Sequence, residues 1–436
     1  MIKIIFISIT ISIFGGLIVN AAVASQVPRL QDSGIDFSKI STITQKHQLA
    51  ILHESKPMEI VIDDEKERVD VRFVSAIATI DAPIEQVRST ILDFSRYKEY
   101  MPQLKKSNVR KNDKSGVVVD FKLKFLLPII KVNLDYTLRY QEEENGDIVW
   151  DYVEGDIEGN MGRWELVPLS KNTTMVIYTV WNDMRSMGFW VRMVLNAQPD
   201  LEVAMPISTT ALVVDALKKE LEKTLKESAP KSMFTKSSRP PQISELGVSA
   251  TTFKSLAKIG TLMLIHPKQQ IPKKEGSDPV DLLFISAGRV VQVPIEKAKA
   301  MTLKFDRYHE FFDQVDEVDV KEIGGNIVAD WELELGFGVI SIGVDYVLEY
   351  NWRNKNTLDF SRLSGDIEYI HGSWEWFSLD NETTLFFYTN ASVVGDEAGM
   401  ILKLANLIPN KDLVLGSSAA AVLAENQAPW IEENAK

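Results

Sequence analysis

A long internal repeat constrains the fold of this chain more than any other feature of its sequence. The segment Gly155–Thr179 (GDIEGNMGRWELVPLSKNTTMVIYT) returns at Gly365–Thr389 as GDIEYIHGSWEWFSLDNETTLFFYT, an offset of 365 minus 155, or 210 residues. Upstream, Phe94–Tyr97 (FSRY) pairs with Phe305–Tyr308 (FDRY) at an offset of 305 minus 94, or 211, so one residue separates the two registers. Each copy takes up about half of the chain, and the sequence therefore predicts two domains of the same fold.

Hydrophobic periodicity gives the order of elements within a copy. Alternation over 71–80 predicts a strand, and apolar residues at helical spacing over 87–94 predict a helix after it. From Val117 onward, alternating apolar and polar residues predict about six half-buried antiparallel strands. A long helix over about 199–226 closes the copy. We therefore predict an α+β fold for each domain.

The two copies suggest a division of the chain into four parts. Residues 1–24 form a targeting segment, and 37–228 and 248–436 form the two domains. Between them, 229–247 is rich in Ser, Lys and Pro and lacks periodicity, which predicts a linker.

The first 24 residues have the pattern of a cleaved signal peptide. Lys3 supplies a positive charge, 4–19 is apolar, and Ala22–Ala24 gives small residues at the cleavage site. An uncleaved membrane anchor is the alternative, although the apolar run is somewhat short for a full span. The chain has no cysteine, which excludes a lipoprotein anchor, disulfides and thiol chemistry. We expect a secreted protein of a bacterial periplasm.

The charge of the chain limits its partners. The formal net charge is −13, which repels phosphate backbones and excludes nucleic acid as a partner. An acidic surface is also poorly attracted to anionic lipid, so any membrane contact should be local, apolar and transient.

Three motifs together resemble a known superfamily. They are Asp81–Leu104 (DAPIEQVRSTILDFSRYKEYMPQL), the Gly-Arg-Trp at 162–164, and a terminal helix after a six-strand meander. This order is similar to the START-like (SRPBCC) superfamily, in particular its polyketide cyclase/dehydrase and coenzyme Q-binding branch. The resemblance implies two tandem helix-grip domains, each a curved antiparallel β-sheet wrapped around a long C-terminal α-helix, with a ligand cavity between them. Copy two departs from the motif, with Lys304 in place of Asp93 and Ser373 in place of Arg163, which leaves its ligand open.

Large aromatic and apolar side chains recur at alternate positions of the predicted strands, which places each group on one strand face. Such side chains suit a cavity that holds an apolar body and orients one polar group, and a plain hydrophobic core has the same pattern. The candidate ligand-binding residues are Phe121, Phe125, Tyr136, Tyr140, Trp150 and Trp164 in copy one, and Trp331, Leu333, Tyr346, Tyr350, Phe360 and Trp374 in copy two.

A Met- and aromatic-rich segment precedes the terminal helix of copy one. In Met184–Leu195 (MRSMGFWVRMVL), we predict a lid or membrane contact formed by Met187, Phe189, Trp190 and Met193. Packing of the segment on its own domain, or between the domains, is an equal alternative. Copy two has GMILKLANLIP at 399–409 in the corresponding place.

Signatures of catalysis are missing. No nucleotide-binding, nucleophile-elbow or zinc-protease motif occurs, and His53 and His266 lack nearby carboxylates, which indicates a structural or surface role. We expect Arg163 and Glu165 to form a solvated ladder on the strand face opposite to Trp164. The carboxylates of Asp156 and Glu158, repeated at Asp366 and Glu368, should mark an exposed face or a turn. We predict no catalytic residue, no metal site and no cofactor.

These observations predict a non-catalytic binding or carrier protein for a lipid, sterol or quinone-like molecule in the periplasm. Two alternatives stay open. One is an enzyme similar to polyketide cyclases and aromatases, with Tyr or Asp side chains as acid and base. The other is a ligand-binding domain paired with a degenerate domain that docks a protein. Direction of transfer and oligomeric state are left open.

Overall fold

The computed structural model describes residues 26–62, 65–127, 130–197, 199–223, 239–271, 280–337, 340–395 and 410–435. The predicted signal peptide 1–24 and the copy-two segment 399–409 lie outside the described residues, as does the part of the predicted linker before residue 239. We call the first repeat domain 1 and the second repeat domain 2.

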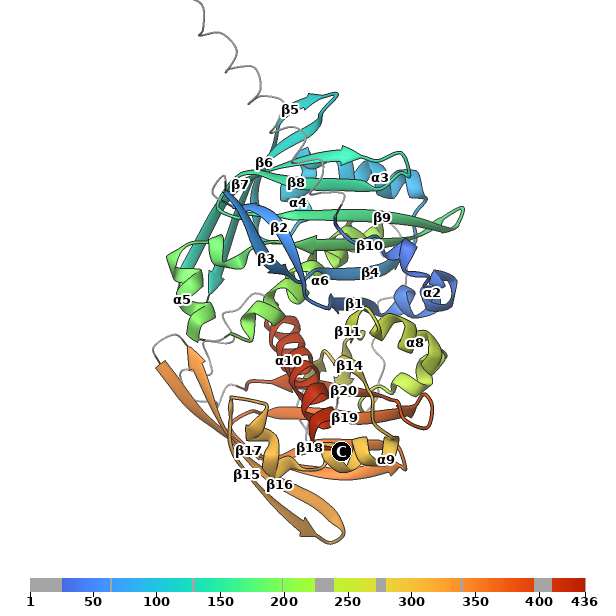
Figure 1. Cartoon of the computed structure of the whole chain (residues 1–436), viewed down its shortest axis with the longest axis vertical. Coiled ribbons are helices and arrows are strands. Elements are labelled where there is room, and N and C mark those ends of the chain that lie inside the picture. The colour runs from blue at the N-terminus through green and yellow to red at the C-terminus, as the bar shows by residue number, and fades with distance from the viewer. Residues whose placement is uncertain are drawn as a thin grey trace, which may run out of the picture.

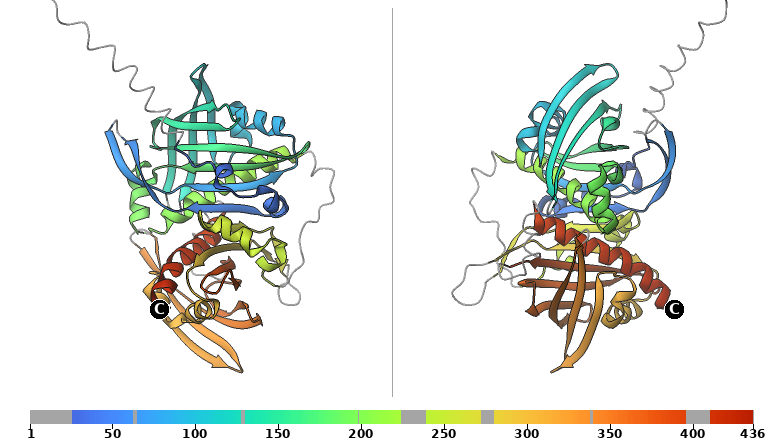
Figure 2. Two further views of the ribbon diagram at one scale, coloured as in Figure 1. Left: turned by 45° about the vertical axis from the view of Figure 1, so that its right-hand side comes forward. Right: turned by 90° about the vertical axis from the view of Figure 1, so that its left-hand side faces the viewer.

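Domain 1 is a curved antiparallel sheet with a long helix against its inner face, as Figures 1 and 2 show. Its helices are η1 (Leu30–Ser33), α2 (Phe37–Lys46), α3 (Ile84–Leu92), η2 (Phe94–Arg96), α4 (Tyr97–Tyr100), η3 (Met184–Ser186), α5 (Phe189–Ala197) and α6 (Leu201–Leu221). Its strands are β1 (Gln48–His53), β2 (Lys56–Ile62), β3 (Glu65–Val71), β4 (Val74–Ile80), β5 (Leu104–Asp113), β6 (Gly116–Leu127), β7 (Ile130–Glu142), β8 (Ile148–Gly155), β9 (Met161–Ser170) and β10 (Thr173–Trp181).

Domain 2 repeats this arrangement element by element. Its helices are η4 (Ile243–Leu246), α8 (Ala250–Ala257), α9 (Ile295–Thr302), η5 (Phe305–Glu310) and α10 (Lys411–Asn434). Its strands are β11 (Gly260–Ile265), β12 (Gln269–Ile271), β13 (Val280–Leu282), β14 (Ile285–Val291), β15 (Val315–Ile323), β16 (Asn326–Phe337), β17 (Ile340–Asn354), β18 (Thr357–Gly365), β19 (Tyr369–Ser378) and β20 (Thr384–Val393).

The predicted fold class is confirmed: each domain is a tandem copy of a helix-grip fold. In domain 1 the meander β5 to β10 continues through β4 to β1, and α6 packs against β4, β1 and β10. In domain 2, β15 to β20 continue through β14 to β11, and α10 packs against β14, β20 and β11.

The two domains share one sheet, which the sequence did not predict. Strand order runs β15-β16-β17-β18-β19-β20-β14-β11-β1-β4-β10-β9-β8-β7-β6-β5, and β1 pairs antiparallel with β11, with Gln48 opposite Ile265 and His53 opposite Gly260. Figure 1 shows this junction at the middle of the molecule, with α6 and α10 beside it. The order is symmetric about the β1–β11 pair, so each domain covers an edge strand of the other.

Both faces of the junction are buried. Ala50 and Leu52 of β1 pack with Met263 of β11 into the cluster that also holds α10 residues, whereas Leu49 and Ile51 pack into a cluster with residues of α2 and α8. A strand buried on both faces reads as a continuous apolar run rather than an alternation. For this reason the sequence pattern gave no signal for the pairing.

Polar contacts reinforce the junction. Glu425 of α10 forms an ion pair with Arg72, which precedes β4, and Arg289 of β14 forms an ion pair with Glu54 at 2.7 Å. Arg289 also lies 3.2 Å from Glu425, so the four side chains form one network across the two domains. Such networks hold orientation better than isolated surface pairs.

Corresponding short helices begin both domains. Glu165 of β9 accepts hydrogen bonds from the backbone N–H groups of Leu30 and Gln31 in η1, and Glu375 of β19 accepts hydrogen bonds from those of Ile243 and Ser244 in η4. Each domain therefore includes a packed short helix, η1 or η4, that precedes residue 37 or 248, the domain starts predicted from the sequence.

Candidate functional site

The inner face of the sheet in domain 1 carries a ladder of aromatic rings. Neighbouring strands place Phe121 opposite Tyr136, Tyr140 opposite Trp150, and Trp164 opposite Tyr178. The ring centroids lie 5.3 Å apart in the first pair, 5.7 Å in the second and 4.3 Å in the third. These distances are typical of favourable aromatic contacts. The structure thus brings the predicted candidate residues of copy one together; of Phe125, only the backbone position in β6 is described.

Domain 2 repeats the ladder. Trp331 lies opposite Tyr346, Tyr350 opposite Phe360, and Trp374 opposite Tyr388, with Leu333 buried in the same core. The centroid distance between Phe360 and Tyr388 is 5.7 Å, and that between Trp374 and Tyr388 is 4.7 Å. The candidate residues of copy two therefore share one interior, and whether they touch a ligand stays a prediction.

Four tyrosines recur at matching positions of the two interiors. We name them the tyrosine set of each domain; sequence analysis singled out only two of the four in each copy. Tyr178 and Tyr388 end the most similar part of the repeat, which was the signal available for them. The sets are Tyr97, Tyr136, Tyr140 and Tyr178 in domain 1, and Tyr308, Tyr346, Tyr350 and Tyr388 in domain 2.

In domain 1, most hydroxyls of the set have no polar partner. Tyr97 donates to the carbonyl of Ile91, but the hydroxyls of Tyr136, Tyr140 and Tyr178 form no hydrogen bond with any residue that the structure describes. Burial raises the pKa of all three hydroxyls, so they are neutral donors at physiological pH. Tyr136 and Tyr178 are partly exposed, whereas Tyr140 is buried.

Domain 2 offers its tyrosines polar neighbours that domain 1 lacks. Gln427 of α10 donates to the Tyr308 hydroxyl at 2.9 Å, and the residue at the matching place in α6, 210 positions earlier (427 minus 210), is Leu217. Burial raises the pKa of Tyr388 to about 12, and the neighbouring Asn390 limits this rise. The matching residue in domain 1 is Val180.

The glycine of the Gly-x-Trp motif makes room for the ladder. A Cβ atom on Gly162 would lie 2.0 Å from Cζ2 of Trp150, and one on Gly372 would lie 2.1 Å from Cζ of Phe360. Only glycine allows the ring of the neighbouring strand to lie flat over this position.

The outer face of the same strands carries a buried charge network, and the prediction of a solvated Arg163 and Glu165 ladder is wrong. Arg163 is 4% exposed and Glu165 is 0% exposed. Arg163 donates to Asp147 at 2.7 Å and to Glu143 at 2.6 Å, and Arg29 donates to the same Asp147 at 2.7 Å. The N-terminal segment folds over this face and excludes water, which local strand periodicity cannot reveal.

The repeated Gly-Asp-Ile-Glu segment forms a turn. Asp156 is exposed and accepts the backbone N–H of Asp135 at 2.7 Å, and Asp366 accepts that of Asp345 at 3.0 Å. Gly155 has a φ of 115°, which favours glycine. These carboxylates therefore cap a turn, as predicted.

A buried chain of polar side chains recurs beside the junction. His53 Nε2 lies 2.7 Å from Ser75 Oγ, which lies 2.7 Å from Thr179 Oγ1, and His266, Ser286 and Thr389 repeat these contacts. Burial lowers the pKa of His53 to about 4, so its ring is neutral. No carboxylate completes this chain in hydrogen bonds that the structure describes, which fits the predicted structural role.

The predicted lid segment packs on its own domain with one face. Val191 and Leu195 of α5 are buried, with Met187 packed against their cluster. Phe189 and Trp190 point outward, 63% and 54% exposed, and Met193 is partly exposed. Within the described ranges, no helix is long and apolar enough to cross a membrane, and no three His, Asp or Glu side chains are grouped to hold a metal ion.

Comparison with known proteins assigns the fold just described. Residues 80–222, from the end of β4 past the end of α6, match a family model described as "Polyketide cyclase / dehydrase and lipid transport". This part of domain 1 is similar to that family. The matched residues include the aromatic ladder and the tyrosine set of domain 1, and domain 2 repeats the fold of domain 1.

Several solved structures resemble the chain at low sequence identity. The di-domain ARO/CYC protein StfQ from the steffimycin biosynthetic pathway is 10% identical, covering 83% of this chain and 99% of its own, with a TM-score of 0.27. Zhui aromatase/cyclase from Streptomyces sp. R1128 is 14% identical, covering 36% and 96%, with a TM-score of 0.30. A STAR-related lipid transfer protein from Xanthomonas axonopodis is 16% identical, covering 38% and 98%, with a TM-score of 0.27. At these TM-scores the likenesses carry no argument about ligand or activity. No curated protein matches the chain.

Proposed function

We propose that the protein binds one apolar molecule in the interior of domain 1 and carries it, unchanged, across the periplasm. The observation behind this proposal is that the hydroxyls of Tyr136, Tyr140 and Tyr178, on the inner face of the sheet, form no hydrogen bond with any described residue. A buried polar group without a hydrogen bond costs about 1–3 kcal/mol. A ligand with one hydrogen-bond acceptor on an apolar body would remove much of that cost, and a lipid, sterol or quinone has this chemistry.

The proposal assigns different roles to the two domains. In domain 2, Gln427 donates to the Tyr308 hydroxyl and Asn390 lies beside Tyr388, whereas Tyr346, like its counterpart in domain 1, has no hydrogen bond among the described residues. We assign the ligand to domain 1 because its interior lacks these two polar side chains and is the more apolar of the two. Domain 2 would then serve domain 1 by covering the edge strand β1 and supporting α6 through α10.

Membrane contact is part of the same proposal. Phe189 and Trp190 are exposed at the start of α5, and aromatic side chains of this kind favour the interface of a bilayer. The buried face of α5 packs against Val132 and Leu134, near the start of β7. This short helix would therefore connect the bilayer with the interior of domain 1. The net charge of −13 agrees with an apolar rather than an electrostatic contact.

An enzyme similar to polyketide cyclases is the second candidate, and the neutral tyrosine hydroxyls favour it as possible proton donors. A carboxylate base beside them would strengthen it. Asp151 and Glu165, whose pKa values burial raises, lie on the opposite sheet face, since their strand neighbours Trp150 and Trp164 face the tyrosines. This placement favours the carrier.

Native mass spectrometry with lipid extraction tests the proposal on mature protein purified from its native host. The double variant Tyr140→Phe/Tyr178→Phe keeps the rings and removes two hydroxyls. The matched control is Tyr350→Phe/Tyr388→Phe in domain 2. We expect wild type and control to retain one apolar molecule per chain, and the domain 1 variant to lose at least about nine-tenths of it, since each lost hydrogen bond contributes about 0.5–1.5 kcal/mol.

Two results would contradict the carrier proposal. An empty wild-type protein would remove its basis, and equal loss in the two double variants would remove the assignment to domain 1. If a polyketide-like molecule is incubated with the protein and recovered with a changed mass, the enzyme candidate replaces the carrier proposal.

A further inference from the structure

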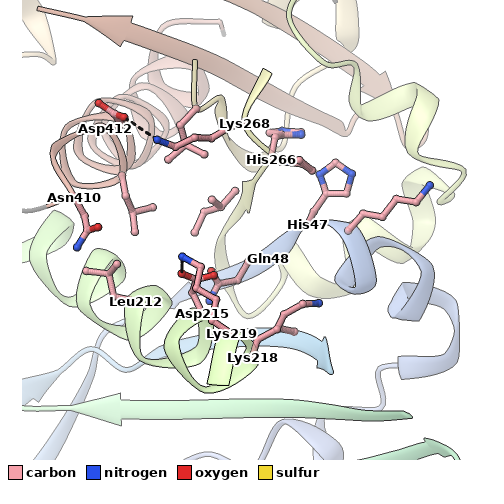
Figure 3. Close-up of a pocket in the computed structure, with 16 residues that line it drawn as sticks. His47, Gln48, Leu212, Asp215, Lys218, Lys219, His266, Lys268, Asn410 and Asp412 are labelled. Carbon is pink, nitrogen blue, oxygen red and sulfur yellow. Dashed lines mark hydrogen bonds and ion pairs between the residues drawn. The ribbon is translucent and has the colours of Figure 1, made fainter. Parts of the chain in front are cut away.

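A separate cavity of about 350 Å³ lies between the two domains. Figure 3 shows its walls: α6 and the start of β1 come from domain 1, and the end of β11 and the start of α10 come from domain 2. This volume lies at the lower end of the range of small-molecule sites. Because both domains line the cavity, neither one alone forms it.

The lining combines an apolar surface with an excess of positive charge. Apolar side chains include Leu212, Leu283 and Leu413. The charged side chains are Lys46, Lys218, Lys219 and Lys268 with Asp215 and Asp412, so the four cations exceed the two anions by two, in a chain whose net charge is −13.

The lysines differ in their pairing. Lys219 lies 2.5 Å from Asp215, and Lys268 lies 3.4 Å from Asp412, as the dashed lines in Figure 3 mark. Lys46 also lines the cavity; it is exposed and has no ion-pair partner among the residues that the structure describes. A positive charge in this cavity is therefore available to an anion.

A buried histidine provides an independent sign of a ligand. His266 lines the cavity and is 2% exposed; its Nε2 is engaged with Ser286 Oγ at 2.7 Å, whereas its Nδ1 has no partner among the described residues. The ring of His47 lies edge-on to it with centroids 5.0 Å apart, and His47 Nδ1 is also unpartnered there. Burial lowers the pKa of both rings, so each is neutral and can form one more hydrogen bond.

We propose that this interdomain cavity binds a small anionic amphiphile, a carboxylate on a short apolar body. Its carboxylate contacts Lys46 and Lys268 and accepts a hydrogen bond from His266, while its apolar part lies on the three leucines. The site is independent of the interior of domain 1, and an alkyl acid from lipid breakdown and a soluble aromatic acid share this chemistry.

Isothermal titration calorimetry of the mature full-length chain tests the ligand class. Octanoate and benzoate distinguish the alkyl from the aromatic source, and octan-1-ol is the neutral control. We expect at least one acid to bind about tenfold or more tightly than the alcohol, and its Kd to rise between about 50 mM and 500 mM salt because salt screens the lysines. Equal binding of octanoate and the alcohol, or no binding of either acid, overturns the proposal.

Variants locate the site. Lys46→Gln/Lys268→Gln changes two exposed side chains and should raise the Kd of the bound acid about tenfold. The matched control, Lys105→Gln/Lys106→Gln, changes two exposed lysines of β5 and should leave it unchanged.

The interior of domain 1 must be distinguished from this cavity. The Tyr140→Phe/Tyr178→Phe variant should bind the acid as wild type does. If that variant loses the acid while the Lys46/Lys268 variant keeps it, the acid binds in the interior, and the interdomain proposal fails while the carrier proposal stands.

Discussion

Asp151 should make the folding stability of this protein fall as the pH rises from about 4 to about 7. The side chain is 6% exposed on the outer sheet face, its Oδ2 has no hydrogen-bond partner among the described residues, and Arg139 is 3.9 Å away. Burial raises its pKa from 3.8 to about 7, with Arg139 offsetting part of the rise. In the unfolded chain Asp151 ionises near its ordinary pKa, so the folded state binds the extra proton between these values.

The sign and size of the effect follow from that gap. The stabilising contribution is complete below about pH 4 and is lost as the pH passes about 7, and the gap between the two pKa values corresponds to about 4 kcal/mol. The variant Asp151→Asn keeps the shape and removes the titration. Relative to wild type it should gain about 4 kcal/mol between pH 4 and pH 8, or about 5 °C in Tm for a chain of this length.

Differential scanning calorimetry of both proteins from pH 4 to pH 8 measures this. The control is Asp113→Asn, at the exposed end of β5, where Lys111 is the main cause that holds the pKa of the carboxyl below its ordinary value. Because Asp113 is ionised in both the folded and the unfolded state above about pH 5, this variant should show nearly the same change of Tm with pH as wild type. The reasoning about burial is refuted if Asp151→Asn and wild type show the same change of Tm with pH.

Three further predictions concern packing. Gly162→Ala should destabilise the fold by about 1–3 kcal/mol or more, because the new methyl overlaps Trp150, whereas Gly343→Ala, with no atom within 4 Å of its Cβ, should have little effect; thermal melts decide this. Glu165→Ala should cost about 2 kcal/mol and speed amide hydrogen exchange in η1, where two N–H groups lose their acceptor; unchanged exchange would contradict the contact. Domain 2 expressed alone should dimerise or aggregate through the uncovered β11, and a stable monomer in light scattering would show that the junction is not needed.

The sequence predicted the elements that depend on local pattern. Alternation along β6 to β10 placed Tyr140 and Trp150 on one face, and the cross-strand register confirms it. The repeat extended the same fold to domain 2, because aligned residues such as Trp164 and Trp374 share a place in the sheet. Both predictions depend on periods of two residues and on an offset that one chain displays by itself.

Features that depend on distant segments were not predictable in this way. Arg163 and Glu165 read as solvent-facing because they alternate with Trp164, yet residues 29–31 cover them. The pairing of β1 with β11 was not predicted, because strands that are buried on both faces show no alternation of apolar and polar residues. The cavity between α6 and α10 requires the relative placement of two copies, which neither copy encodes alone.

The junction also explains how two copies of one fold can differ inside. Pairing of β1 with β11 covers one edge of each domain whatever the interiors contain. The residues of the aromatic ladders can therefore differ between the domains without affecting this contact. At one place in the helix facing the tyrosine set, domain 1 has Leu217 and domain 2 has Gln427, which donates to Tyr308. The glutamine adds a second hydrogen bond to the Tyr308 hydroxyl, which also donates to the carbonyl of Thr302, whereas a leucine leaves the interior apolar apart from its tyrosines. Replacing Leu217 with Gln should therefore give domain 1 the polar character of domain 2 and reduce the amount of apolar ligand that it retains.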